Sequence, residues 1–95
     1  MKGTIVGTVS QIGEIQEFGE NAFKKQEVIF KTVEEFPNVY CVEFTQKNIE
    51  LVNDLEVGKN YKATVNLKGR EHINDKEEYN VFHSVNCWRI EPLNV

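Results

Sequence analysis

Residues 58–71 read GKNYKATVNLKGRE and alternate cleanly between two kinds of residue. Successive residues of a β-strand point to opposite faces, so this period of two predicts a half-buried strand. The face expected to point inward carries apolar or small residues, namely Tyr61, Ala63, Val65, Leu67 and Gly69. The face expected to point outward carries polar residues, namely Lys62, Thr64, Asn66, Lys68 and Arg70.

The residues just before this strand follow a longer period. Ile49, Val52 and Leu55 are three residues apart, which places them on one face of a helix. Thr45 is suited to cap the start of this helix, and Gly58 is suited to end it. The segment therefore predicts one short amphipathic helix.

Three β-forming segments precede the helix: GTIVGTVSQI at residues 3–12, FKKQEVIFKTV at residues 23–33 and VYCVEFT at residues 39–45. Two glycines interrupt the first segment, as a sharply bent strand requires. In the second segment Val28 and Phe30 are two residues apart, and in the third Tyr40, Val42 and Phe44 share one face. We expect three successive strands.

Turn-like sequences separate the strands. The acidic segment Gly13–Asn21, the EEFPN sequence around Pro37 and the polar segment at residues 71–78 are all expected to be loops.

The last β-forming segment, YNVFHSVNCWRI at residues 79–90, is the expected fifth strand. Phe82, Trp88 and Ile90 share a parity and are expected to point inward. A buried Trp88 would make Trp88→Ala severely destabilising, because truncating a buried aromatic side chain costs about 3 to 5 kcal/mol.

The expected order of elements is β-β-β-α-β-β, which is the order of the five-stranded OB-fold barrel. Closure of a barrel explains why each strand has a single apolar face. The chain length of 95 residues suits one domain, so we expect a single OB-fold domain over residues 1–95. An SH3-like barrel or another small β-roll is the alternative fold.

The charge and composition limit the function classes. A net charge of −4 argues against a strongly basic protein that binds duplex nucleic acid, because phosphate neutralisation supplies most of that affinity. No apolar run approaches the roughly 20 residues that span a bilayer, and the N-terminus lacks a secretion signal. Cys41 and Cys87 have no close spacing and are expected to be reduced thiols in a cytoplasmic protein.

The sequence offers few groups for catalysis. His72 and His83 are the only histidines, and neither stands in a metal-ligand pattern. The adjacent acidic pairs, Glu34 with Glu35 and Glu77 with Glu78, are expected to be solvated. We therefore expect no enzymatic activity, no metal and no cofactor.

Aromatic and basic residues occur together in the FGENAFKK sequence. Proteins that hold single-stranded nucleic acid combine cations for the backbone with aromatic faces for the bases. Phe18, Phe23, Lys24 and Lys25 supply both groups. Phe18 is equally suited to cap the end of the barrel.

A second group of candidate binding residues follows the alternating strand. In OB folds the loop between the last two strands flanks the ligand groove, together with the loop between the first two. Lys68, Arg70, His72 and Tyr79 are the candidates at this second wall, and Tyr40 is a candidate at the rim near Pro37.

Five short sequences resemble a family of small bacterial and phage proteins that carries only the label of a domain of unknown function. They are GTV near residues 7–9, FGENAFKKQE at residues 18–27, EFTQ at residues 43–46, GRE at residues 69–71 and WRIE at residues 88–91. The resemblance implies an OB fold similar to that of single-stranded DNA-binding proteins. His72 stands where the family often has an aromatic residue.

The expected function is sequence-tolerant binding of single-stranded DNA during replication or recombination, in the host cytoplasm if the protein is encoded by a phage. RNA as a second ligand, a homo-oligomer and contacts with replication proteins remain open, and no membrane partner is expected. The alternatives are an OB-fold module that docks on proteins and a phage-encoded inhibitor of a host enzyme.

Overall fold

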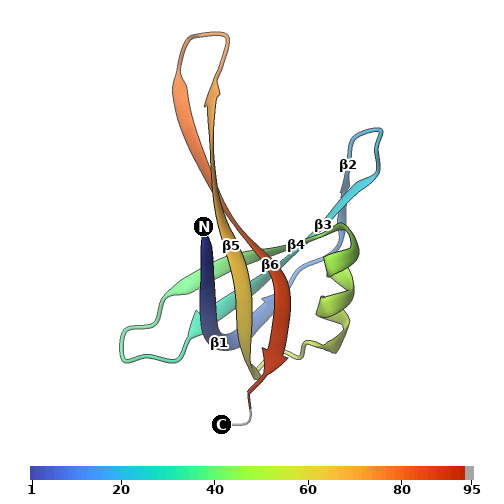
Figure 1. Ribbon diagram of the computed structural model, residues 1–95, viewed down its shortest axis with the longest axis vertical. Coiled ribbons are helices and arrows are strands. Elements are labelled where there is room, and N and C mark those ends of the chain that lie inside the picture. The colour runs from blue at the N-terminus through green and yellow to red at the C-terminus, as the bar shows by residue number, and fades with distance from the viewer. Residues whose placement is uncertain (94–95) are drawn as a thin grey trace.

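Residues 1–93 are described by the structure, a computed structural model, and they form six strands and one 3-10 helix (Figure 1). In chain order the elements are β1 (Lys2–Ile12), β2 (Gln16–Phe18), β3 (Phe23–Thr32), β4 (Val39–Thr45), η1 (Gln46–Asp54), β5 (Asn60–Ile73) and β6 (Tyr79–Pro92). No helix within residues 1–93 has the length and apolar character needed to cross a membrane.

The strands form one sheet in the order β1-β5-β6-β4-β3-β2, and an additional pairing of β1 with β3 closes it into a barrel. All pairings are antiparallel except that of β4 with β6. The predicted class, mostly β with one short helix and a barrel of five long strands, is confirmed.

The first strand, β1, bends because it pairs with two different strands. Lys2 to Thr8 pair with β5, and Gly7 to Ile12 pair with β3, with an irregularity between Val9 and Gln11. A Cβ atom on Gly7 would lie 2.7 Å from the backbone oxygen of Lys31, closer than side-chain carbons approach. The glycine therefore permits the close crossing that the bend requires.

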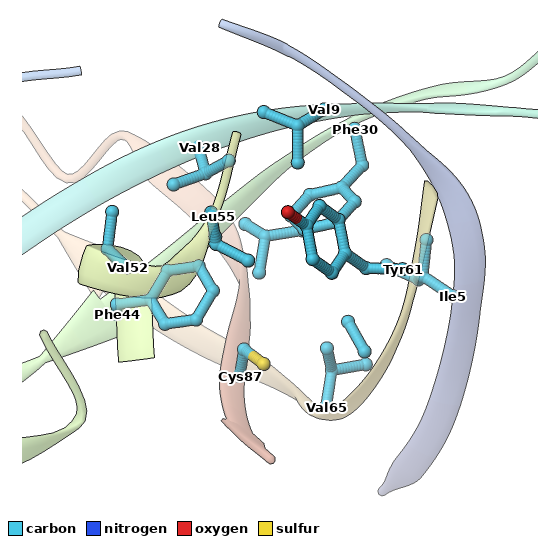
Figure 2. Packing of buried hydrophobic residues seen from close by; sticks show 12 residues of the cluster. Ile5, Val9, Val28, Phe30, Phe44, Val52, Leu55, Tyr61, Val65 and Cys87 are labelled. Atoms are coloured by element: carbon cyan, nitrogen blue, oxygen red, sulfur yellow. The ribbon is translucent and has the colours of Figure 1, made fainter. Parts of the chain in front are cut away.

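The core fills the barrel, and η1 covers one end of it (Figures 1 and 2). Val52 of η1 and Leu55, which follows its last residue, are buried beside Phe44, and Ile49 packs against the core, as the helical spacing predicts. The Tyr61 hydroxyl accepts a hydrogen bond of 2.9 Å from the backbone N–H of Glu56. The buried residues are Ile5, Val9, Val28, Phe30, Val42, Phe44, Val52, Leu55, Tyr61, Ala63, Val65 and Cys87.

The ends of η1 differ from the prediction in two details. Thr45 occupies the N-cap position in an extended conformation, but its side chain makes no capping hydrogen bond. The helix ends at Asp54, earlier than Gly58. Gly58 adopts a positive φ of 92° in the following turn, where its N–H donates to the Val9 carbonyl at 2.8 Å.

The segment Gly13–Asn21 is only partly a loop, which corrects the prediction. Gln16–Phe18 form β2 and pair with β3, and Phe18 lies opposite Phe23. A turn with positive φ at Gly19 and Ala22 connects the two strands. The polar composition of the segment hid this strand, because all three residues of β2 are exposed and none packs into the core.

The predicted inward position of Trp88 and Phe82 is wrong. Thr64 pairs with Arg89 and Val65 pairs with Cys87, so Trp88 is the extra residue of a β-bulge and is 42% exposed. The bulge reverses the parity of β6, which buries Cys87 and leaves Phe82 on the outer face, 54% exposed.

The β5–β6 hairpin extends well beyond the barrel (Figure 1). The two strands stay paired as far as Ile73 and Tyr79, so the expected loop at residues 71–78 is shorter than predicted. The Asn74 side-chain oxygen accepts hydrogen bonds from the N–H groups of Lys76 at 2.9 Å and Glu78 at 3.0 Å, which orders the turn. Leu67, predicted to point into the core, is exposed, because the pairing of β5 with β1 ends at Asn66 and only β6 accompanies β5 beyond it.

Cys87 links the stability of this core to pH. Burial raises the pKa of its thiol from 9.0 to about 11, against the weaker lowering effect of a backbone hydrogen bond at Arg89. Between pH 9 and pH 11 the unfolded chain loses this proton while the folded chain keeps it, so stability falls as pH rises.

We expect the free energy of unfolding to fall by roughly 2 to 3 kcal/mol over this window on account of Cys87, and Cys87→Ala to lack that part of the fall. Urea unfolding of the parent and the variant at pH 8 and pH 11 measures the difference. Equal pH dependence in the two proteins would contradict a buried neutral thiol.

Candidate functional site

A groove of about 670 Å³ lies on the outer face of the barrel between two projecting hairpins, β2–β3 and β5–β6. Phe23 and Lys25 of β3 line one side. Lys68 and Arg70 of β5 and Phe82 of β6 line the other. The groove therefore brings together residues that are far apart in the sequence.

The strand registers explain why these side chains share one surface. Directly opposed residues in an antiparallel pair point to the same side of a sheet. Arg70 lies opposite Phe82, and Lys68 lies opposite Ser84. Lys25 lies opposite Thr45, which also lines the groove. The pairing of β4 with β6 joins the two halves into one continuous outer face.

Exposed aromatic rings are a main feature of the groove. Phe23 is 39% exposed and Phe82 is 54% exposed, although both are large apolar side chains. Phe18 is also exposed, and it lies opposite Phe23 at the end of the β2–β3 hairpin. The Lys25 Nζ lies 5.4 Å from the centre of the Phe18 ring, within the range of a cation–π contact.

The cations of the groove differ in their partners. Lys25 forms ion pairs with Glu43 at 3.3 Å and with Glu27 at 3.9 Å, so much of its charge is compensated. Lys68 and Arg70 form no ion pair with any residue in the described range 1–93. The uncompensated positive charge therefore lies on the β5 side.

The outer face next to the groove also carries a thiol. Cys41 donates a hydrogen bond to the Glu27 carboxylate. Partial burial, followed by this hydrogen bond, raises the pKa of Cys41 to about 11. The thiol is protonated at neutral pH and is a poor nucleophile there.

Several predicted site residues do not line the groove. Lys24 alternates with Phe23 and Lys25 and therefore points to the other side of β3. Tyr40 lies opposite the buried Phe30, at the far end of β4.

The hairpin residues among the predictions divide between its two faces. His72 lies on the same face as Arg70 but closer to the hairpin tip, and it is not part of the groove lining. Tyr79 lies on the opposite face, where its hydroxyl donates a hydrogen bond of 2.9 Å to Glu71. Phe23, Lys25, Lys68 and Arg70 are thus the predicted residues that the groove brings together.

Phe82 is the aromatic residue of the groove lining that the sequence did not predict. Phe82 was assigned to the core because it has the same parity as Trp88 in the predicted strand, and the bulge was not foreseen. A signal was available, because Asn80, Ser84 and Asn86 share its parity and are all polar. This pattern indicates a solvated face for this part of the strand.

A larger cavity of about 920 Å³ lies at the other end of the barrel, between η1 and the end of β6. Leu51, Ile90 and Leu93 contribute apolar lining, and its cation Lys59 is paired with Glu56 at 2.6 Å. This cavity lacks the exposed rings and uncompensated cations of the groove. Nowhere in residues 1–93 do three or more His, Cys, Asp or Glu side chains gather in a group able to hold a metal ion.

Comparison with solved structures supports the fold. The chain is similar to a crystal structure described as the mitochondrial single-stranded DNA binding protein Rim1 from S. cerevisiae, with a TM-score of 0.72 and 14% sequence identity. The match covers 98% of this chain and 94% of that chain. The likeness confirms the OB fold.

No curated protein matches the sequence. The family model of DUF3127, a domain of unknown function, matches residues 4–91, nearly the whole chain. The resemblance to a family labelled in this way is thereby confirmed. The chain belongs to the DUF3127 family.

Proposed function

We propose that this protein binds single-stranded DNA, with little regard to sequence, in the groove between the β2–β3 and β5–β6 hairpins. The observation that carries the proposal is the meeting of two exposed rings, Phe23 and Phe82, with two cations, Lys68 and Arg70, that form no ion pair within residues 1–93. Rings and cations on one open surface are the two components that single-strand binding requires.

The chemistry of these side chains accounts for tolerance of sequence. A phenylalanine ring stacks on the face of a base, and every base has such a face. Phe23 and Phe82 carry no donor or acceptor that reads a base edge. Lys68 and Arg70 are suited to the phosphate backbone, which is the same at every nucleotide.

Two further observations support single strands over duplex. The net charge of −4 lowers the affinity for the dense negative charge of a duplex, while the local cations of the groove remain available to a single strand. The similar solved structure is described as a single-stranded DNA binding protein. We infer a role in protecting or organising single strands during replication or recombination in the cytoplasm.

The electrostatic part of binding should be modest. If Lys68 and Arg70 meet about two phosphates, the slope of log affinity against log salt is expected to be about −1.4, since single strands contribute roughly −0.7 per contact. Anisotropy of a labelled oligothymidine, titrated at several salt concentrations between about 50 and 200 mM, measures this slope.

A matched duplex and an oligouridine complete this experiment. The duplex is expected to bind more weakly than oligothymidine, and the oligouridine shows whether RNA competes. Affinity that does not change with salt would remove the cations from the proposal, and tighter binding of the duplex would contradict it.

Docking on proteins is the second candidate function, and one observation favours it. The other face of the β5–β6 hairpin exposes an apolar stripe made of Leu67, Ile73, Tyr79 and Val81. Exposed apolar patches commonly mark interaction surfaces. Failure of oligothymidine to bind, together with self-association that Ile73→Lys abolishes, would favour this function over DNA binding.

A further inference from the structure

Trp88 lies on the outer face of the barrel but is not part of the groove lining, so binding in the groove does not explain its exposure. The bulge opposite Thr64 and Val65 turns its ring outward, where it is 42% exposed. The Lys2 Nζ of β1 lies 5.8 Å from the centre of this ring, a cation–π distance. An aromatic face and a cation therefore meet at a second place on the surface.

A row of side chains on the outer face connects the groove to this place. Along β6 the row passes from Phe82 through Ser84 and Asn86, whose side chains are joined by a hydrogen bond of 3.1 Å, to Trp88. Phe82, Ser84 and Asn86 line the groove, and Trp88 lies beyond it. The distance from Phe82 to Trp88 is about 20 Å at the usual rise of a strand.

β5, on one side of β6, supplies cations along the same row, whereas β4, on the other side, places Glu43 opposite Asn86. Arg70 lies opposite Phe82, Lys68 opposite Ser84, and Asn66 opposite Asn86. On the far side of β5, Lys2 lies opposite Asn66.

The residues of this row on β6, β5 and β1 include three cations, and Glu43, the carboxylate beside Asn86, is already paired with Lys25 at 3.3 Å. Beyond it, Glu91 is paired with Arg89 at 2.9 Å. A polyanion that leaves the groove in this direction meets no uncompensated negative charge among the residues named.

We propose that Trp88 and Lys2 form a second stacking site, and that a single strand runs from the groove across the outer face of β6 and β5 to reach it. This inference rests on the proposed function of the groove. The Trp88 ring stacks on a base, and Lys2, already beside the ring, meets the adjoining phosphate. The bound segment is consequently longer than the groove alone would hold.

Oligonucleotide length separates the two sites. An oligothymidine of about 5 nucleotides fits the groove, whereas one of about 16, the upper end of the range for one OB fold, is long enough to continue along the row. Anisotropy of the labelled oligomers gives the affinity for each length. Trp88→Ala is expected to weaken the longer oligomer about 5- to 150-fold, the equivalent of one stacked base, and to leave the shorter one unchanged.

Three further variants sharpen the test. Trp88→Phe keeps a ring and is expected to restore much of the affinity for the longer oligomer. Lys2→Ala is expected to weaken it and to reduce the magnitude of its salt slope by roughly 0.7. Lys47→Ala removes an exposed lysine of η1, outside the row, and is the matched control with parental affinity.

Trp88 is the only tryptophan of the chain, so its intrinsic fluorescence reports directly on this site. The longer oligomer is expected to quench the fluorescence more strongly than the shorter one at saturation. If the longer oligomer binds Trp88→Ala as tightly as the parent, the second site is overturned while the groove stands. If neither oligomer binds the parent protein, the proposed function fails as well.

Discussion

Phe44→Ala is expected to lower the free energy of unfolding by about 3 to 5 kcal/mol, because the substitution removes a large ring from a core that cannot close around the space. Phe44 is fully buried, and it lies beside Val52 of η1 and Leu55, the residue after η1 (Figure 2). For a chain of 95 residues the total stability is about 5 to 14 kcal/mol, so the loss is a large fraction of it. Urea unfolding of the two proteins measures the change.

Trp88→Ala is the matched control for this prediction. The Trp88 ring lies outside the barrel, so its removal is expected to cost about 1 kcal/mol or less and to shift the melting temperature by only a few degrees. This expectation is the reverse of the one that the parity of the strand suggested. A loss as large as that of Phe44→Ala would show that Trp88 belongs to the core and that the bulge is misplaced.

Phe23→Ala and Arg70→Ala are expected to weaken oligothymidine binding in two distinguishable ways. Loss of the Phe23 ring costs about 1 to 3 kcal/mol for oligonucleotides of any composition and leaves the salt slope nearly unchanged. Loss of Arg70 reduces the magnitude of the slope by roughly 0.7, and the defect shrinks as salt rises because the lost interaction is itself screened.

Both variants are expected to keep the parental melting temperature within a few degrees, since both side chains are exposed. Titrations at two salt concentrations and melting curves together distinguish a binding role from a structural one. A large loss of stability in Phe23→Ala, with unchanged binding by both variants, would favour protein docking as the function.

The spacing of apolar residues along the chain correctly predicted those parts of the strands whose side chains are buried. The alternation of Tyr61, Ala63 and Val65 predicted the buried half of β5 because these side chains do face the core. The same alternation failed at Leu67. Nothing in the sequence of β5 itself indicates where the hairpin leaves the barrel, since that point depends on the lengths of the other strands.

The bulge of β6 shows a second limit. A bulge is a property of two paired strands, so the sequence of one strand does not reveal it. The prediction assumed strict alternation along β6, so the one extra residue at Trp88 led it to place both Trp88 and Phe82 on the wrong face. The polar residues around Phe82 were the better indication that this part of β6 faces solvent. Their polarity reflects the local environment and does not depend on counting alternate residues across the bulge.

The candidate site was predicted best where strand parity was unbroken. Phe23 and Lys25 were predicted as one group of binding residues and Arg70 as part of a second wall, and the groove brings the three together. Tyr79 follows a hairpin turn whose length the sequence did not fix, and it lies on the opposite face from Arg70.

NMR mapping of bound oligothymidine locates the ligand without any substitution. If single strands bind in the groove, backbone amide shifts change at Phe23, Lys68, Arg70 and Phe82, with little change at Leu51 and Ile90 in the cavity at the other end. Shift changes confined to that cavity, or none at saturating oligothymidine, would show that the groove is not the binding site.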